Sequence, residues 1–256
     1  MEWQDEGVVL SARRLGERDA VAQLLTRDHG RHAGLVRGGA SRRLRPLLQP
    51  GNRLACRWRA RLAQQLGSFT VEPLRLYAST VLDSPLALAA MGSALELAAA
   101  TVGERDPHPR LYAGLLWLLE ELAARPEDWL TRYVKFELLV LEEAGFGLQL
   151  ERCAVTGRTE ELAYVSPRTG RAVSRQAAGS WAPRLLPLPA FLCGAEGAST
   201  ADILEGLRLC GFFLRRHLLA PTGRPLPAAR ERLLRLLRDQ LCGAEPEVPT
   251  SSAHRD

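Results

Sequence analysis

GERDAVAQLLTRDHGRHAGLVRGGASRR, residues Gly16–Arg43, sets the architecture of the first third of this chain. Two short apolar runs, Ala20–Thr26 and Arg31–Val36, are separated by the turn signal Asp28-His29-Gly30 and predict two neighbouring β-strands. The stretch ends in Arg37–Arg43, a small-residue loop with arginines at both ends. Glycines let a backbone approach phosphate closely and guanidinium groups bind it bidentately, so this loop is a candidate contact for nucleic acid.

Three more β-like runs surround this stretch, at Gly7–Ser11, Leu54–Leu62 and Gly67–Pro73. Five short strands with glycine-rich turns predict a small closed barrel, for which we favour an OB-fold over an SH3-like barrel. The run at Leu54 alternates apolar residues with arginines, and the period of two in a strand puts the two kinds on opposite faces. The predicted inward residues are Leu54, Cys56, Trp58, Ala60 and Leu62, and the predicted outward ladder is Arg53, Arg57, Arg59 and Arg61.

Helical periodicity replaces the strand pattern from Asp83 onward, where Ser84 is a predicted cap and Pro85 opens the first turn. The predicted helices are Leu86–Val102, a second beginning at Asp106-Pro107, Glu127–Ala144, Ser199–Leu219 and Pro225–Leu241. The predicted fold class is therefore an α+β multidomain protein. Its predicted parts are the OB-fold (1–80), a helical domain (81–149 and 199–242), a loop-rich insert (150–198) and a disordered tail (243–256).

Charge is distributed unevenly, although the formal net charge is only +5. Residues 1–80 hold 14 arginines against 7 acidic residues, whereas residues 81–150 hold 5 basic residues against 11 acidic ones. This asymmetry indicates separate surfaces for separate partners. The 5 cysteines are widely spaced with no CxxC pair, which argues against disulfides and a local zinc site. With no apolar run long enough for a bilayer and no signal-peptide pattern, we expect a cytoplasmic, nucleoid-associated protein without a membrane segment.

No catalytic signature is present, so the sequence predicts binding rather than an enzymatic activity. The cluster Glu17, Arg18 and Asp19 is interpreted as a turn held by its own ion pairs. His29 and His32 could form a pair of bases or metal ligands, but turn and surface positions are the preferred interpretation. No cofactor is predicted.

The predicted DNA contacts are cationic, because barrels with a basic face hold strands by phosphate contacts and base stacking. The alternative is that these arginines only keep an exposed sheet face soluble, which would make the protein a protein–protein adaptor with a basic OB-fold. The predicted contact residues are Arg37, Gly38, Gly39, Arg42, Arg43, Arg45, Arg57, Arg59 and Arg61.

Four segments in order resemble the RecO family of bacterial recombination mediators: residues 7–43, Tyr133–Gly157, Ala163–Ser174 and His217–Leu234. The resemblance covers Glu2 to Leu241 and implies an OB-fold, a helical domain and an inserted zinc-finger-like loop. It also implies binding of single- and double-stranded DNA, annealing of complementary strands, and loading of the recombinase RecA with the partner RecR. RecF, acting indirectly, and the acidic C-terminal tail of single-strand-binding protein (SSB) are the other implied partners.

The insert departs from the zinc-binding pattern of the family, which has two CxxC pairs. The corresponding positions here are Cys153, Thr156, Ser174 and Ala177, so only one thiolate remains. Because structural zinc needs four nitrogen or sulfur ligands, we predict no metal. The loop must then be held by packing, for which the predicted residues are Leu150, Tyr164, Val165 and Trp181.

The SSB tail requires an apolar groove with a cation at its rim. Cations are few in the acidic middle of the chain, which leaves Arg132 and Lys135, beside Tyr133 and Phe136, as the predicted site. The alternative for Tyr133 and Phe136 is structural support of the helical bundle.

Overall fold

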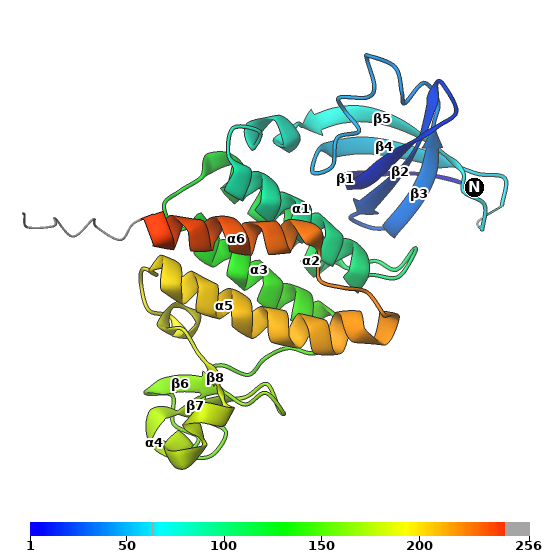
Figure 1. Cartoon of the computed structure of the whole chain (residues 1–256). Coiled ribbons are helices and arrows are strands. Elements are labelled where there is room, and N and C mark those ends of the chain that lie inside the picture. The colour runs from blue at the N-terminus through cyan, green and yellow to red at the C-terminus, as the bar shows by residue number, and fades with distance from the viewer. Residues whose placement is uncertain (63, 244–256) are drawn as a thin grey trace, which may run out of the picture.

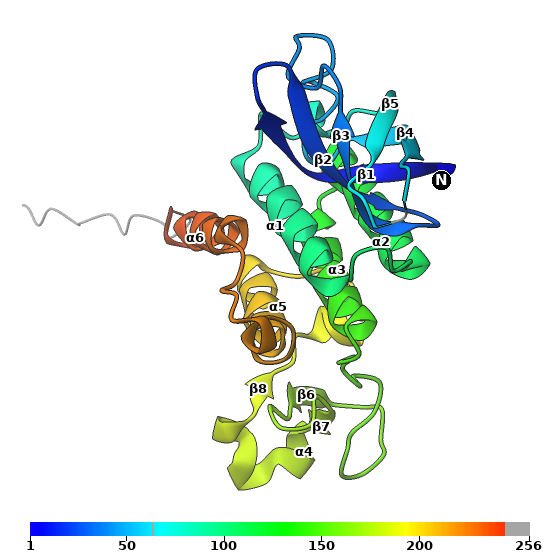
Figure 2. The same ribbon diagram turned by 90° about the vertical axis from the view of Figure 1, so that its right-hand side faces the viewer.

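The computed structural model describes residues 1–62 and 64–243. A β-barrel lies at one end, a helical bundle in the middle and a small β-containing insert at the other end (Figure 1). The same order is seen after a quarter turn, so the bundle separates the barrel from the insert (Figure 2). Of the predicted disordered tail, 243–256, residues 244–256 lie outside the described residues, whereas Gly243 is the last residue of helix α6, so the prediction is wrong at this residue.

The N-terminal barrel contains five strands in the closed order β1-β2-β3-β5-β4. Neighbouring strands are antiparallel except β3 and β5, which pair in parallel through Leu35 and Val36 against Ser68 and Phe69. This order confirms the predicted OB-fold over the SH3-like alternative. The strands are β1 (Glu2–Leu15), β2 (Asp19–Thr26), β3 (Gly30–Val36), β4 (Arg53–Arg59) and β5 (Ser68–Arg75).

Two strand boundaries differ from the prediction. β1 is longer because its polar residues continue the ladder with β4, from Glu2 opposite Arg59 to Val8 opposite Arg53. Leu62 lies beyond the end of β4 and is 55% exposed, so its predicted inward position is wrong. The alternation holds within β4 itself, where Trp58 is 2% exposed and donates its indole N–H to the carbonyl of Leu66.

Five longer helices form the bundle, and their ends follow local sequence signals. Ser84 caps α1 through the N–H of Ala87, and Pro85 occupies the first turn as predicted. Ser199 and Asp202 form a capping box at α5. The bundle helices are α1 (Pro85–Thr101), α2 (Pro109–Ala124), α3 (Trp129–Glu143), α5 (Thr200–Phe213) and α6 (Ala228–Gly243). Shorter helical turns are Tyr77–Thr80, Ala190–Cys193, a π-helical turn at Leu214–Leu219 and Ala220–Thr222.

A buried polar network joins four of these helices. The Arg230 guanidinium of α6 donates to the Glu137 carboxylate of α3 over 2.7 and 2.9 Å, and to the Leu207 carbonyl of α5 over 2.5 Å. The Tyr133 hydroxyl lies 2.9 Å from Glu137 and 2.6 Å from the Ser93 hydroxyl of α1. All these polar groups are desolvated, so each depends on the others for its hydrogen bonds.

The insert between α3 and α5 is a three-stranded sheet with its own small core. Cys153, Val173 and Ala178 form that core, and Tyr164 packs against it. Trp181 is 62% exposed, so its predicted packing role is wrong. The elements are β6 (Leu162–Val165), β7 (Ala172–Ser174), α4 (Arg175–Ala178), a 3₁₀ turn at Gly179–Arg184 and β8 (Leu186–Pro187), in the sheet order β7-β6-β8.

Candidate nucleic-acid interface

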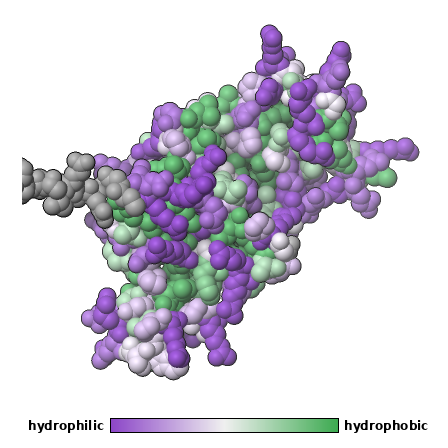
Figure 3. Space-filling model, in the orientation of Figure 1, coloured by the Kyte–Doolittle hydropathy of each residue, from purple (hydrophilic) through white to green (hydrophobic). Residues whose placement is uncertain are grey.

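The predicted arginine loop directly follows β3, and its arginines lie on the barrel surface. Arg37, Arg42, Arg43 and Arg45 are all exposed. Hydrophilic side chains project from this end of the molecule (Figure 3). In the part of the chain that the structure describes, none of these four arginines forms an ion pair, so their guanidinium groups are available to phosphate.

Two glycines shape the start of this loop. Gly38 adopts φ +68°, a left-handed conformation that glycine accepts at little cost, and its N–H donates to the Asp19 carboxylate over 2.8 Å. A Cβ on Gly39 would lie 2.8 Å from that of Ala20, so only glycine fits there. Asp19 thus ties the loop to the preceding hairpin. Within the described residues it has no ion pair with Arg18, so the predicted internal ion pairs of this turn are wrong.

Asn52 holds the segment that follows the loop against the Tyr77–Thr80 turn, which precedes the bundle. Its buried amide nitrogen donates to the carbonyls of Pro46 and Leu47, over 2.9 and 3.1 Å, and its amide oxygen accepts from the N–H of Ala78 over 3.0 Å. One side chain therefore satisfies three backbone groups, and the chain is anchored before and after the arginines of the loop.

The predicted arginine ladder on β4 faces outward, but acids of β1 neutralise much of it. Arg59 donates to Glu2 over 2.8 and 3.1 Å, and Arg57 lies 3.7 Å from the same carboxylate. The hydrogen bond from Arg59 lowers the pKa of Glu2. Arg53 pairs with Glu6. The ladder therefore presents less free charge than its sequence indicates.

An open groove of about 660 Å³ brings the loop and the ladder together. Arg37 and Arg43 of the loop line one side, and Arg59 of β4 and the exposed edge of β5 line the other. A second hollow of about 290 Å³ joins Arg45 to Arg13 and Arg14 of the β1–β2 hairpin, which are absent from the predicted DNA contacts. The sequence did not indicate Arg13 and Arg14 as DNA contacts because they lie in a strand distant from the loop along the chain. They lie beside the loop only because the barrel closes. Arg61 is exposed beyond β4 and lines neither hollow.

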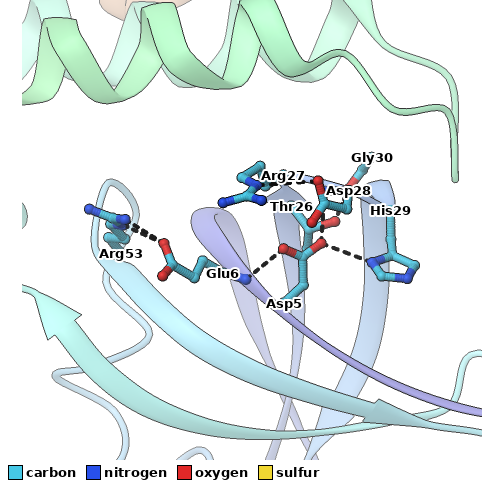
Figure 4. Close-up of polar contacts among 8 residues, drawn as sticks. All are labelled: Asp5, Glu6, Thr26, Arg27, Asp28, His29, Gly30 and Arg53. Carbon is cyan, nitrogen blue, oxygen red and sulfur yellow. Dashed lines mark hydrogen bonds and ion pairs between the residues drawn. The ribbon is translucent and has the colours of Figure 1, made fainter.

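The two histidines lie at the opposite end of the barrel from this loop. The His29 ring stacks on Trp3 at a centroid distance of 4.1 Å. Its Nδ1 lies 2.8 Å from the carboxylate of Asp5, which also accepts from the N–H of Asp28 (Figure 4). His32 is only 6% exposed, so its predicted surface position is wrong. Within the described residues, no group of three or more histidine, cysteine or acidic side chains could hold a metal.

Cys153 retains an anion-stabilising environment although the other positions of the zinc pattern are not cysteine. Its sulfur accepts from the N–H of Ser174 over 3.3 Å. Burial opposes the thiolate, but hydrogen bonds from Thr156 and Ser174 outweigh it and lower the pKa of Cys153 to about 6. Hydrogen bonds from its own chain thus stabilise the thiolate form of Cys153.

The four residues predicted to bind the SSB tail do not share one surface. Tyr133 and Phe136 are 0% and 2% exposed and support the bundle core. Arg132 pairs with Glu121 and Asp128. Lys135 is exposed at the rim of a groove of about 430 Å³ whose apolar lining is Leu138, Leu139, Leu148, Leu150 and Leu192. That groove has the apolar walls and rim cation that an acidic tail requires, with Glu142 and Glu151 also in its lining.

Comparison with known proteins matches both parts of the chain. The family models described as Recombination protein O N terminal and Recombination protein O C terminal match residues 1–77 and 82–225. Proteins named DNA repair protein RecO are 52% identical in Cereibacter sphaeroides, over 93% of this chain and 98% of the relative. The corresponding proteins of Rhodospirillum centenum and Jannaschia are 52% and 48% identical, over 91% and 94% of this chain and 94% and 98% of the relative. No helix among the described residues is long and apolar enough to cross a membrane. With both family models matched and half of its residues identical to those relatives, the chain belongs to the RecO family.

Proposed function

We propose that the protein is a DNA-binding recombination mediator that holds DNA in the groove between the Arg37–Arg43 loop and β4. The observation that carries the proposal is the convergence of Arg37, Arg43 and Arg59 on one open groove of an OB-fold. Guanidinium groups on both sides of a groove can contact successive phosphates of one strand. The strand would lie along the barrel surface and leave its bases accessible for pairing.

The salt dependence of DNA binding tests this proposal. Arg37→Ala/Arg42→Ala/Arg43→Ala should lower the slope of log K against log salt by about one for each phosphate that the variant no longer neutralises. The control is Arg208→Ala/Arg235→Ala/Arg238→Ala, which removes the same charge from exposed positions of α5 and α6. An unchanged slope in the loop variant would contradict the assignment.

The adaptor alternative is favoured by the neutralisation of Arg57 and Arg59 by Glu2. If the remaining charge is too weak, the barrel binds partners and not DNA. A mobility-shift assay with single-stranded DNA distinguishes the two, because an adaptor gives no shifted species at physiological salt.

Mediation requires partners as well as DNA. Membership of the family supports RecR and the acidic SSB tail as direct partners and RecF as an indirect one. With them the protein would anneal complementary strands and help to load RecA. For the tail we propose the groove beside Lys135, in place of a site containing the buried Tyr133 and Phe136. Lys135→Glu should weaken binding of an acidic peptide that ends in an apolar residue, measured by fluorescence anisotropy. Arg208→Glu, a charge reversal elsewhere on the bundle, is the control.

A further inference from the structure

A column of three rings rises from the bundle core to the surface at the C-terminal ends of α3 and α5. Phe213, 2% exposed, lies at its base. His217 lies nearly parallel to it at a centroid distance of 6.1 Å, and Phe146 stacks on His217 at 4.6 Å with an interplanar angle of 23°. Phe146 is 41% exposed, so the column ends in an accessible aromatic ring.

The backbone beside this column is a π-helical turn, Leu214–Leu219, which directly follows α5. Such turns are rare in proteins and are frequent at functional sites. Here the turn carries Arg215 and Arg216 in exposed positions immediately before His217. The apolar period of the sequence predicts one uninterrupted helix to Leu219. The change to π-helical geometry after Phe213 could therefore not be predicted from the sequence.

The turn between β6 and β7 brings two more arginines to the same place. Arg216 donates to the carbonyl of Pro167 over 3.4 Å, and a Cβ on Gly170 would lie at ordinary contact distance, 3.8 Å, from the ring of Phe213. Arg168 and Arg171 of this turn are exposed. Among the described residues, no ion pair engages any of the four arginines at this junction.

We propose that this junction is a second site for single-stranded nucleic acid, separate from the barrel. An unpaired base stacks on Phe146 and extends the column, and arginines from both elements hold the flanking phosphates. Base–aromatic stacking tolerates any sequence because every base has a π-face, and arginine planes add cation–π attraction. A flat ring at the end of a column suits a base better than a peptide side chain, which needs an enclosing groove.

The position of this site adds a property that the barrel alone does not supply. The insert and the barrel lie on opposite sides of the bundle (Figure 1), so one protomer can hold two strands at separate places. That two-strand consequence rests on the proposed function of the barrel, whereas the second site stands on its own geometry.

Photochemical crosslinking of the full chain locates both sites in one experiment. An oligodeoxythymidylate containing 5-iodouracil is irradiated with the protein, and crosslinked peptides are mapped by mass spectrometry. Crosslinks at Phe146 or His217 together with crosslinks in the barrel are expected. Crosslinks in the barrel only would overturn the second site and leave the proposed function standing. Crosslinks at the column only would support the second site and contradict the barrel. Crosslinks at neither place would overturn both.

Affinity measurements then test the role of the ring. In the Arg37→Ala/Arg42→Ala/Arg43→Ala background, Phe146→Ala should weaken the remaining oligonucleotide binding about tenfold. Phe146→Trp should preserve it. The control is Trp181→Ala, which removes an exposed aromatic ring of the insert that lies outside the column. Unchanged affinity after Phe146→Ala would overturn the proposal.

The arginines give a test that does not depend on the ring. Arg215→Ala/Arg216→Ala changes only exposed side chains and should reduce the salt slope by about one to two. Arg208→Ala on the same helix should not change it. An acidic peptide that binds the wild-type junction in place of the oligonucleotide, and no longer binds after Phe146→Ala, would overturn the proposal in favour of a protein partner.

Discussion

The carboxylate of Asp19 accepts the backbone N–H of Gly38 over 2.8 Å and so joins the β1–β2 hairpin to the arginine loop. This bond holds Gly38 in its left-handed conformation at the point where the chain leaves β3. We expect Asp19→Ala to free the loop and to weaken DNA binding by about tenfold, since a hydrogen bond to a charged group contributes at least ~1.5 kcal/mol and each 1.4 kcal/mol is about tenfold in affinity. Equilibrium binding of single-stranded DNA at fixed salt measures the effect.

Asp19→Ala also removes a negative charge near the arginines, and this alone should raise the affinity for DNA. The variant therefore needs a control for charge. Glu17→Ala removes the same charge from the same hairpin, where the main-chain carbonyl of Glu17, and not its side chain, accepts from Arg14. The expected result is equal or tighter binding for Glu17→Ala and weaker binding for Asp19→Ala. Equal effects of the two variants would contradict a positioning role for Asp19.

The buried pair of Glu137 and Arg230 should make the bundle sensitive to loss of either partner. Arg230 is 1% exposed and Glu137 is fully buried, so truncating the arginine leaves an uncompensated carboxylate in the core. We expect Arg230→Ala to lower the free energy of unfolding by ~3–5 kcal/mol. Urea denaturation followed by circular dichroism measures the change.

Arg232 provides the matched comparison for this pair. It lies on the same helix, α6, but is exposed, so Arg232→Ala should change the unfolding free energy by less than about 0.5 kcal/mol. A similar loss in both variants would contradict the assignment of this stability to the buried pair, because alanine is the better helix former at either position.

The barrel could be predicted because its signals are local. Arg57 and Trp58 alternate in sequence and face opposite sides in the structure. The neutralisation of Arg57 and Arg59 could not be predicted, since it depends on β1 closing against β4 and bringing Glu2 across from them. Spacing alone gives the face of a residue and not the charge of its neighbour on another strand.

The bundle shows the same limit. The apolar period of α3 predicted an inward face containing Tyr133 and Phe136, and both are buried. The prediction that Tyr133 and Phe136 also bind a peptide is incompatible with this burial, because a bound peptide needs exposed side chains. Glu137 follows them in sequence as an apparently solvent-exposed acid, and its burial depends on Arg230, 93 residues away. Polar pairing across such a separation leaves no periodic signal.

The insert should contain no stoichiometric zinc. Cys153 is the single cysteine at the positions of the zinc pattern, and its thiolate is already stabilised by hydrogen bonds from Thr156 and Ser174. Elemental analysis of the purified protein is expected to give well below one zinc per chain, and a chelator should leave the unfolding midpoint unchanged. One equivalent of zinc, or a chelator-induced loss of stability, would contradict the interpretation.

His32 should make the barrel less stable at mildly acidic pH. Among residues 1–62 and 64–243, neither buried ring nitrogen has a partner at full hydrogen-bond geometry, and the ring lies edge-on to Trp3 and Trp58. Burial lowers the pKa of His32 from its ordinary value of 6.5 and outweighs the opposing interaction with the backbone of His29, and the nearby Arg105 lowers the pKa further. The unfolded chain therefore binds more protons than the folded one once the pH falls below about 6.5.

The sign of the effect follows from this difference in proton binding. The free energy of unfolding should be highest above pH 6.5 and should fall as the pH drops from there through the lower folded pKa of His32. His32→Phe retains an aromatic ring without a titrating group and should flatten this dependence in urea unfolding between pH 8 and 5. His29→Asn should retain the dependence. Both variants remove a histidine from the same part of the barrel. Loss of the dependence in His29→Asn, with retention in His32→Phe, would contradict the assignment to His32.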